Sequence, residues 1–195
     1  MTGPRYRWAV LAAGTAAQAS FSTLTLGLPA IAPALRAEFG LDLHGIGLLF
    51  AAQWFGIAVA LLPWGFVVDR VGERWALGAG LAGCGALLAS IALTDAFLVA
   101  GLLLALAGAV GASVQSASGR AVMHWFRAEE RGFAFGVRQT AVVLGGFIGA
   151  VALPLLVRVG DVDAAFVFLG GLCVVAASVG VVVVRDAPRT DVERG

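Results

Sequence analysis

The sequence predicts an all-α membrane protein, a bundle of six transmembrane helices, on two observations. Of the 195 residues, 60% are hydrophobic and 13% are charged, and the mean hydropathy is +0.94; globular domains carry about 25% charged residues. The apolar runs also reach the roughly 18 residues needed to cross a bilayer core, without the period-two alternation of barrel strands. Helices follow because a spanning backbone must satisfy its own hydrogen bonds.

Six apolar runs follow one another along the chain. They cover residues 8–35, 45–68, 75–93, 96–119, 132–157 and 164–184. Segments 1–7 and 185–195 are expected to be short tails, which leaves no room for a separate soluble domain. The chain has 27 glycines, many of them inside the spans, and small residues let helix backbones approach closely in lipid.

The arginines predict the orientation, because all 13 basic residues are arginines and they are unevenly distributed. Only Arg36 and Arg158 fall on one side of the predicted membrane, and Arg138 lies within a span. The other side holds Arg5, Arg7, Arg70, Arg74, Arg120, Arg127, Arg131, Arg185, Arg189 and Arg194. The positive-inside rule then places both termini in the cytoplasm. The expected location is the inner (plasma) membrane of a bacterium.

The N-terminal run was compared with a signal peptide, since Arg5 and Arg7 precede it and Ala17-Gln18-Ala19 has small residues typical of a cleavage site. The run continues through Ile31, which is too long for a signal peptide, so we expect it to be retained. Cys84 and Cys173 fall inside spans and are expected to be small apolar fillers. Neither a disulfide framework, a metal site nor a cofactor is predicted.

The connection between the second and third spans carries the pattern G-x-x-x-D-R-x-G-x-R, made by Gly65, Asp69, Arg70, Gly72 and Arg74. This pattern resembles the loop signature of the major facilitator superfamily of secondary transporters. The segment H-W-F-R-A-E-E-R-G at 124–132 is similar to the family's aromatic and E-R-G loop between spans four and five. The resemblance covers residues 8–185.

The resemblance implies half of a transporter, because members usually have twelve spans in two six-helix halves and this chain is similar to the N-terminal half. The six spans would form two inverted groups of three. The Leu-Pro pairs at 62–63 and 153–154, in the second and fifth spans, are a weak sequence similarity between the two groups. The missing half would come from a longer chain, from a second copy or from a separate half-transporter.

The resemblance also implies a gate at the cytoplasmic loop. In the family, the aspartate equivalent to Asp69 meets an arginine near the end of the fourth span and the start of a helix in the other half. Arg120 or Arg127 could supply the arginine. A carboxylate facing a helix N-terminus is worth up to about 2 kcal/mol, enough to bias a gate. The alternative is a solvated turn that only obeys the positive-inside rule.

Polar residues inside the spans are candidates for the substrate path. Gln18, Ser22 and Thr25 share one helix face by their spacing, and Pro29 and Pro33 would loosen the same helix. The other candidates are Ser113 and Ser116 in the fourth span, with Arg120 a turn below, and Gln53 and Trp54 in the second. Hydrogen bonds to neighbouring helices are the alternative role for each of them.

Arg138 is the most unusual residue, since it lies about 9 Å into the fifth span at 1.5 Å per residue. A guanidinium near the membrane centre costs about 2.5–3.5 kcal/mol unless it extends back to the headgroups. Arg138, Gln139 and Thr140 together are predicted to face a substrate. None of the 12 acidic residues lies deep in a span, which favours an anionic substrate over a cation. The stretch Gly136 to Thr140 also resembles bacterial family members proposed to handle small anions.

Two departures from the family pattern limit the prediction of mechanism. Leu104 stands where many proton-coupled members have an arginine, so proton coupling through that position is not expected. The fifth span matches the antiporter glycine signature at Gly136, Gly145 and Gly149 but departs from it at Ala150 and Leu153. No direction of transport is therefore predicted.

Other classes of protein explain the sequence less well. Gly111 to Val114 faintly suggests an intramembrane serine protease, but His44 and His124 fall at span ends, so no enzyme is predicted. No re-entrant loop or ring of charge indicates a channel, and nothing indicates a nucleic-acid partner. The prediction is alternating-access transport of a small, anionic solute; a non-transporting accessory or relic membrane protein is the alternative.

Overall fold

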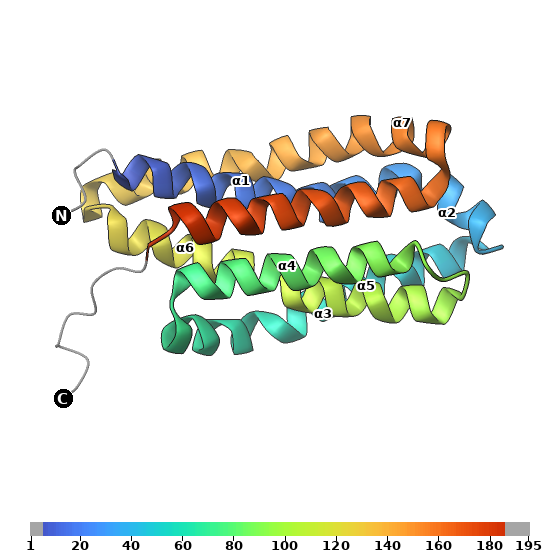
Figure 1. Cartoon of the computed structure of the whole chain (residues 1–195), viewed down its shortest axis with the longest axis horizontal. Helices are drawn as coiled ribbons and strands as arrows, with labels where there is room; N and C mark the ends of the chain where they lie inside the picture. The colour runs from blue at the N-terminus through green and yellow to red at the C-terminus, as the bar shows by residue number, and fades with distance from the viewer. Residues whose placement is uncertain (1–5, 186–195) are drawn as a thin grey trace.

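The computed structural model describes residues 6–185, and every regular element in that range is a helix. In chain order the elements are α1 Tyr6–Gly27, η1 Leu28–Ile31, α2 Ala32–Glu38, α3 Leu43–Val71, α4 Glu73–Ile91, α5 Phe97–Gly111, α6 Ser113–Trp125 and α7 Ala128–Val183 (Figure 1). Arg5, Arg189 and Arg194, which count toward the predicted arginine asymmetry, lie outside the described residues, as do most of the two predicted tails.

The first span is one rod, Tyr6–Glu38, built from α1, η1 and α2. Pro29 lies at the start of η1 and Pro33 at the start of α2. Because proline has no N–H to donate, the α-helical ladder gives way here to a 3-10 turn. The two prolines interrupt this helix, as predicted.

The second and third spans are α3 and α4, joined by Gly72 alone. Asp42 begins α3 by accepting a hydrogen bond from the Gly45 backbone N–H at 2.7 Å. Both helices extend past the predicted limits of 68 and 75, since the charged residues of the connection continue the helices instead of forming a loop.

The fourth span is longer than the predicted run 96–119. It consists of α5 and α6, which meet at Ala112; this residue keeps helical angles (φ −58°, ψ −19°), and the rod continues to Trp125. The apolar run ends earlier because the last two turns of α6 carry Arg120 and His124, whose side chains contact Asp69 of α3 and Glu73 of α4.

The last two spans are the two legs of α7, which is 56 residues long. Within it Gly160 (φ −156°, ψ 25°) and Asp161 (φ 62°, ψ −172°) leave the helical region, and Figure 1 shows the chain reversing there. Residues 6–185 thus contain five helical rods apolar enough to cross a membrane, the last of them folded into two legs. The predicted six-span class is confirmed, although the expected polar loop at 158–163 is a two-residue reversal.

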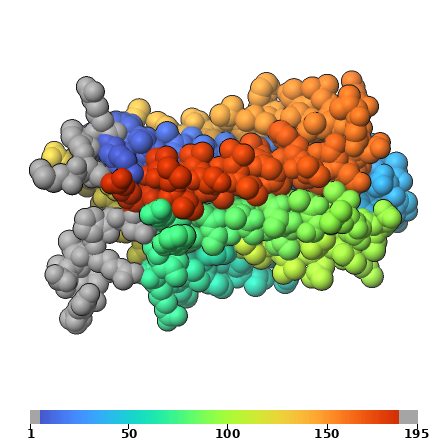
Figure 2. Space-filling view, viewed as in Figure 1, coloured from blue at the N-terminus to red at the C-terminus, as the bar shows by residue number. Residues whose placement is uncertain are grey.

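Glycine pairs bring the rods into contact. A Cβ on Gly149 of the first α7 leg would lie 2.5 Å from the Gly27 Cα, and a Cβ on Gly170 of the second leg would lie 2.7 Å from the Gly85 carbonyl oxygen. Figure 2 shows α4 and the second leg of α7 side by side along their lengths. These contacts require glycine because a side chain would overlap backbone atoms of the neighbouring helix.

The outer surface of the bundle is apolar. Leu62 is 78% exposed, Leu98 81% and Val143 75%. A soluble monomer rarely exposes such side chains on several helices at once, so these faces agree with a bundle surrounded by lipid or by another half.

Candidate functional site

One end of the bundle gathers most of the described arginines, and we call it the basic end. It contains the start of α1, the α3–α4 and α6–α7 connections and the end of α7, with Arg7, Arg70, Arg74, Arg120, Arg127, Arg131 and Arg185. Arg36 and Arg158 lie at the opposite end. The described arginines therefore fall into the two predicted groups; which end faces the cytoplasm stays a prediction.

Gly72 makes the turn between α3 and α4 at the basic end. Its φ of 88° and ψ of 164° are rarely adopted by residues with a side chain, and its N–H donates to the Val68 carbonyl at 3.0 Å. The turn places Asp69 on the last turn of α3 and Glu73 on the first turn of α4. A carboxylate is favoured at a helix N-terminus and disfavoured at a C-terminus, so Asp69 needs a cationic partner more than Glu73 does.

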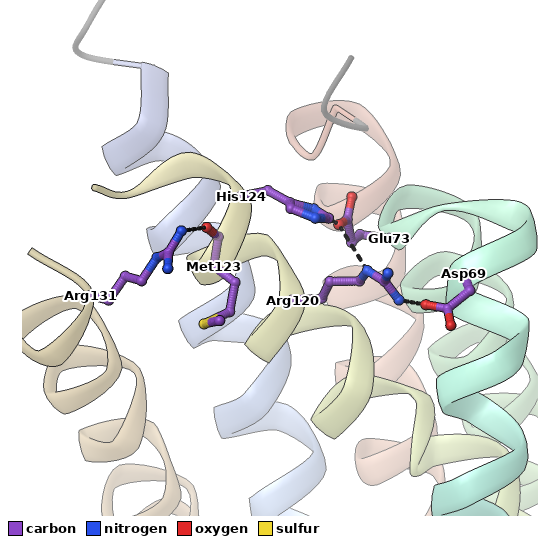
Figure 3. Close-up of polar contacts among 6 residues, drawn as sticks. All are labelled: Asp69, Glu73, Arg120, Met123, His124 and Arg131. Atoms are coloured by element: carbon purple, nitrogen blue, oxygen red, sulfur yellow. Dashed lines mark hydrogen bonds and ion pairs between the residues drawn. The ribbon is translucent and has the colours of Figure 1, made fainter. Parts of the chain in front are cut away.

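Four side chains from three helices form what we call the latch cluster: Asp69 of α3, Glu73 of α4, and Arg120 and His124 of α6 (Figure 3). Arg120 forms an ion pair with Asp69, and its Nε lies 4.0 Å from Glu73 Oε1. His124 Nδ1 lies 2.6 Å from the same Glu73 oxygen. Arg120 and His124 are one helical turn apart, so one face of α6 serves both carboxylates.

The two carboxylates of the latch cluster differ in burial. The Glu73 side chain is 5% exposed, whereas that of Asp69 is 50% exposed. Exposed ion pairs contribute at most about 1 kcal/mol, but a buried charge that loses its partner costs several times more. Glu73 is thus the structural member of the cluster, and the Asp69 pair is the part that can open at low cost.

The E-R-G segment at the start of α7 fastens the neighbouring helices. Arg131 donates from Nη2 to the Met123 carbonyl at 2.9 Å (Figure 3). Its Nε donates to the Phe126 carbonyl at 3.2 Å, and the two bonds cap the C-terminal end of α6. Arg7 of α1 donates to both oxygens of Glu130, at 2.6 and 3.0 Å. Each charged residue of this segment therefore links α7 to another helix.

The remaining residues of the predicted gating loop lie outside the latch cluster. Of the two arginines considered for Asp69, the structure brings Arg120 to it, while Arg127 is exposed at the start of α7. The Arg74 guanidinium lies over the Trp75 ring, 5.3 Å from its centroid, and Arg70 lies on the last turn of α3. A Cβ on Gly65 would meet nothing within 4 Å, so the described part of the chain gives no steric reason for glycine there.

The second candidate centre surrounds Arg138, which is 7% exposed. We call it the Arg138 cluster. Arg138 Nε donates to Ser118 Oγ at 2.8 Å, and Arg138 Nη2 donates to Gln18 Oε1 at 2.9 Å and to Gln115 Oε1 at 3.0 Å. These partners come from α1 and α6, so Arg138 joins three helices. The guanidinium is therefore held inside the bundle.

The space beside the guanidinium is small. A cavity of about 10 Å³ between α1, α6 and α7 is lined by Arg138, Ser118 and apolar side chains such as Val10 and Phe126, which is room for about one water molecule. A larger apolar groove of about 460 Å³ runs along α1 and α7, with Trp8, Thr15 and Leu144 among its lining residues.

Three of the predicted polar residues in the first span share a buried face. Gln18 Nε2 donates to Ser22 Oγ at 3.2 Å, and Thr25 Oγ1 donates to the Ser22 carbonyl at 3.4 Å. Gln18 alone connects this face to Arg138.

The other predicted path residues are scattered. Gln53 and Ser113 are buried, with the Gln53 Nε2 and the Ser113 Oγ lacking a hydrogen-bond partner among residues 6–185. Ser116 is half-buried and Trp54 is 50% exposed. Gln139 and Thr140 are exposed, and the Thr140 hydroxyl donates to the Val137 carbonyl at 2.7 Å. The amides beside Arg138 are therefore Gln18 and Gln115, not the adjacent Gln139.

Sequence reasoning missed five residues of these two centres and their supports: Glu73, Gln115, Ser118, His124 as a pairing partner, and Arg131 as a helix cap. A signal was present for two of them, since Gln115 and Ser118 are polar residues three apart in the fourth span and share a helix face. No sequence signal linked them to Arg138, because that contact depends on how the helices are rotated against each other.

The described residues do not bring together the serine and the histidine considered for an intramembrane protease. Ser113 and His124 are on the same helix and about 16 Å apart along it, too far for a serine–histidine pair. No group of three His, Cys, Asp or Glu side chains within residues 6–185 could hold a metal ion. Cys84 and Cys173 are both fully buried, on α4 and the second leg of α7.

Comparison with known proteins gives close relatives over nearly the whole chain. An uncharacterized MFS-type transporter of Mycobacterium tuberculosis is 35% identical over 188 residues, which are 96% of this chain and 42% of that protein. A probable sulfoacetate transporter of Cupriavidus necator is 28% identical over 155 residues, 72% of this chain and 33% of that protein. The chain spans less than half the length of these relatives.

A solved structure shares the fold. The inward-facing, unoccupied crystal structure of a bacterial homolog of the human lysosomal transporter Spinster superposes with a TM-score of 0.85 at 17% identity, over 97% of this chain and 45% of that one. The sequence profile of the Major Facilitator Superfamily matches residues 10–195. With this match and the relative from M. tuberculosis, the chain belongs to the Major Facilitator Superfamily of membrane transporters.

Proposed function

We propose that this chain forms the substrate-binding half of a carrier that moves a small anionic solute across the inner membrane of a bacterium by alternating access. The observation that carries the proposal is the buried, uncompensated charge of Arg138. Its hydrogen bonds within residues 6–185 go to neutral oxygens of Gln18, Gln115 and Ser118. No carboxylate of residues 6–185 forms an ion pair with it.

A guanidinium in this position attracts anions. Placing a charge inside the membrane is costly, so such residues pair with one another or line a substrate pathway. The hydrogen bonds from neutral oxygens orient the guanidinium and leave its charge unneutralised. An anion would supply the missing charge, and the planar guanidinium suits the oxygens of a carboxylate or sulfonate. The relative from C. necator is named for sulfoacetate, which is an anion.

The latch cluster would serve as the gate at the basic end, facing the cytoplasm. The half-exposed Asp69–Arg120 pair holds α3 against α6, next to the buried Glu73. A second six-span half would complete the cavity over the exposed faces, supplied by the rest of a longer chain, a second copy or a separate protein. The intact mass in the native membrane and the assembly state after extraction distinguish these three sources.

The test is flux of radiolabelled sulfoacetate into liposomes that contain the purified chain, with binding measured in detergent by isothermal titration calorimetry. Arg138→Gln should reduce the flux and the binding affinity by at least tenfold, which corresponds to a loss of about 1.4 kcal/mol of binding free energy. The flux and affinity of Arg138→Lys should lie between those of the unmodified chain and Arg138→Gln, because lysine keeps the positive charge but lacks the planar, two-pronged donor group of arginine. Ser178→Ala, an exposed change on the second leg of α7, is the control. Absence of binding and flux with sulfoacetate, acetate, sulfate and nitrate would favour a non-transporting role.

A further inference from the structure

The three residues that hold Arg138 are unequal in burial. Gln18 is 1% exposed and Ser118 is 2% exposed, whereas Gln115 lies on an exposed face of α6. Two partners are thus built into the interior, and the third has an exposed side chain, whose movement disturbs the packing least. This difference indicates a different role for Gln115.

The hydrogen bonds at Nη2 agree with this distinction. Nη2 has two hydrogens and three nearby acceptors: Gln18 Oε1 at 2.9 Å, Gln115 Oε1 at 3.0 Å and the Gln115 carbonyl oxygen at 3.4 Å. If the Gln115 side chain moves away, Gln18 and the Gln115 backbone still accept from Nη2. The Gln115 carboxamide can therefore be replaced without leaving the guanidinium unsatisfied.

Access to the guanidinium also favours the Gln115 side. The cavity beside Arg138 has a volume of about 10 Å³, too small for a carboxylate or sulfonate group. Gln18 and Ser118 close the interior side. Of the three partner residues only Gln115 is exposed, so an anion that approaches from outside the bundle meets the guanidinium on the Gln115 side.

We propose that the Gln115 carboxamide is an internal placeholder for the anion: its Oε1 occupies the position on Nη2 that a substrate oxygen takes when it binds. The inference rests on the proposed function, since it assumes that Arg138 binds the substrate. A carboxylate or sulfonate oxygen displaces the amide oxygen because hydrogen bonds to charged acceptors are stronger. A neutral amide or hydroxyl gains nothing over Gln115, so the placeholder selects anions.

The proposal makes Gln115 a specificity residue and predicts an unusual sign. Truncation of a residue that only positions Arg138 weakens binding, whereas truncation of a competitor strengthens it. In isothermal titration with sulfoacetate, Gln115→Ala should lower the Kd about fivefold, because the anion no longer has to replace the hydrogen bond between Gln115 and Arg138. Gln115→Asn, whose amide is one methylene shorter, should change the Kd in the same direction.

Two further variants bracket the prediction. Gln115→Glu would place a permanent anion on Arg138 and should raise the Kd for sulfoacetate more than tenfold. Gln18→Ala removes the buried partner and should also raise the Kd, because Gln18 positions the guanidinium. Acetamide, a neutral probe, should not bind to the unmodified chain and should bind measurably to Gln115→Ala.

The outcomes separate this inference from the proposed function. If the unmodified chain binds none of sulfoacetate, acetate, sulfate and nitrate, or binds them no more tightly than Arg138→Gln does, the proposed function fails and the placeholder fails with it. If Arg138 is required and Gln115→Ala and Gln115→Asn bind sulfoacetate equally or more weakly, only the placeholder is overturned. Size-exclusion profiles that match the unmodified chain show that the variants are folded.

Discussion

The two ends of the bundle are closed by different interactions. The basic end is held by ion pairs between helices, those of the latch cluster and the Arg7–Glu130 pair. Toward the opposite end, helices meet through glycines, Gly27 with Gly149 and Gly85 with Gly170, and no ion pair links two helices there within residues 6–185. Ion pairs can exchange partners, but backbone contacts fixed by glycine are lost when the helices separate.

Under the proposed alternating access, the two ends would move by different means. Opening the basic end would require new partners for a few charges, which water or another protein segment can supply. At the opposite end, the pairs of rods that meet through glycine are better suited to move together as rigid units. The following variants test this comparison, from the largest expected effect to the smallest.

Gly149→Val should have the largest effect. A Cβ there would lie 2.5 Å from the Gly27 Cα and 2.7 Å from the Thr23 carbonyl oxygen, and backbone atoms cannot move aside cheaply. We expect a loss of roughly 3 kcal/mol or more, seen as aggregation or a lower melting temperature in detergent. Gly136→Val on the same leg is the matched control, because a Cβ at Gly136 meets nothing within 4 Å. Equal losses in both would show that the Gly27–Gly149 contact is not what closes this end.

Glu73→Gln should destabilise the basic end by about 2 kcal/mol, since it weakens a buried charged hydrogen bond to His124 and leaves Arg120 with one carboxylate. Asp69→Asn should cost less than about 1 kcal/mol, because its pair is half exposed. Thermal unfolding of the two variants side by side gives the ranking. A larger loss in Asp69→Asn would reverse the roles assigned to the two carboxylates.

Asp161→Gly should stabilise the opposite end by about 1 kcal/mol. Asp161 has φ 62° and ψ −172°, a conformation nearly restricted to glycine that costs other residues of order 1–3 kcal/mol. Part of the gain is lost to the greater freedom of glycine in the unfolded chain. The melting temperature should rise; a fall would mean that the aspartate side chain itself stabilises the reversal.

The smallest effect concerns Arg7 and Glu130. A double-mutant cycle with Arg7→Gln and Glu130→Gln should give a coupling free energy of about 0.5–1 kcal/mol, because the pair is bidentate yet partly exposed. The coupling should shrink in 1 M salt, where screening acts within about 3 Å. The effect of Gly149→Val should not change with salt, and a parallel change in both would remove the contrast between the two ends.

The sequence alone predicted more of the fold than of the candidate site. Apolar length alone places the spans, because the bilayer sets a minimum run that the sequence must supply. The predicted span boundaries were wrong where charged residues pair across helices. For example, α6 continues past Arg120 to Trp125, beyond the predicted limit of 119.

Within the site, local and long-range features divide clearly. The turn at Gly72 and the position of Asp69 beside it could be predicted because a short motif marks this connection. The same motif left Arg120 and Arg127 as the two possible partners of Asp69. The partners of Arg138 lie 20, 23 and 120 residues away, and their contacts depend on helix rotation and tilt. A single sequence specifies these through the packing of many side chains at once, so Gln139 and Thr140, which adjoin Arg138 in the chain, were the wrong guide to its neighbours.

The hydroxyl of Tyr6 donates to the Val183 carbonyl at 2.6 Å, so the first and last spans lie next to each other at the basic end. The order in which the chain visits the spans is therefore separable from the shape of the bundle. A circular permutant with a linker between the present ends and a new opening at the Gly160–Asp161 reversal would keep every helix contact described above.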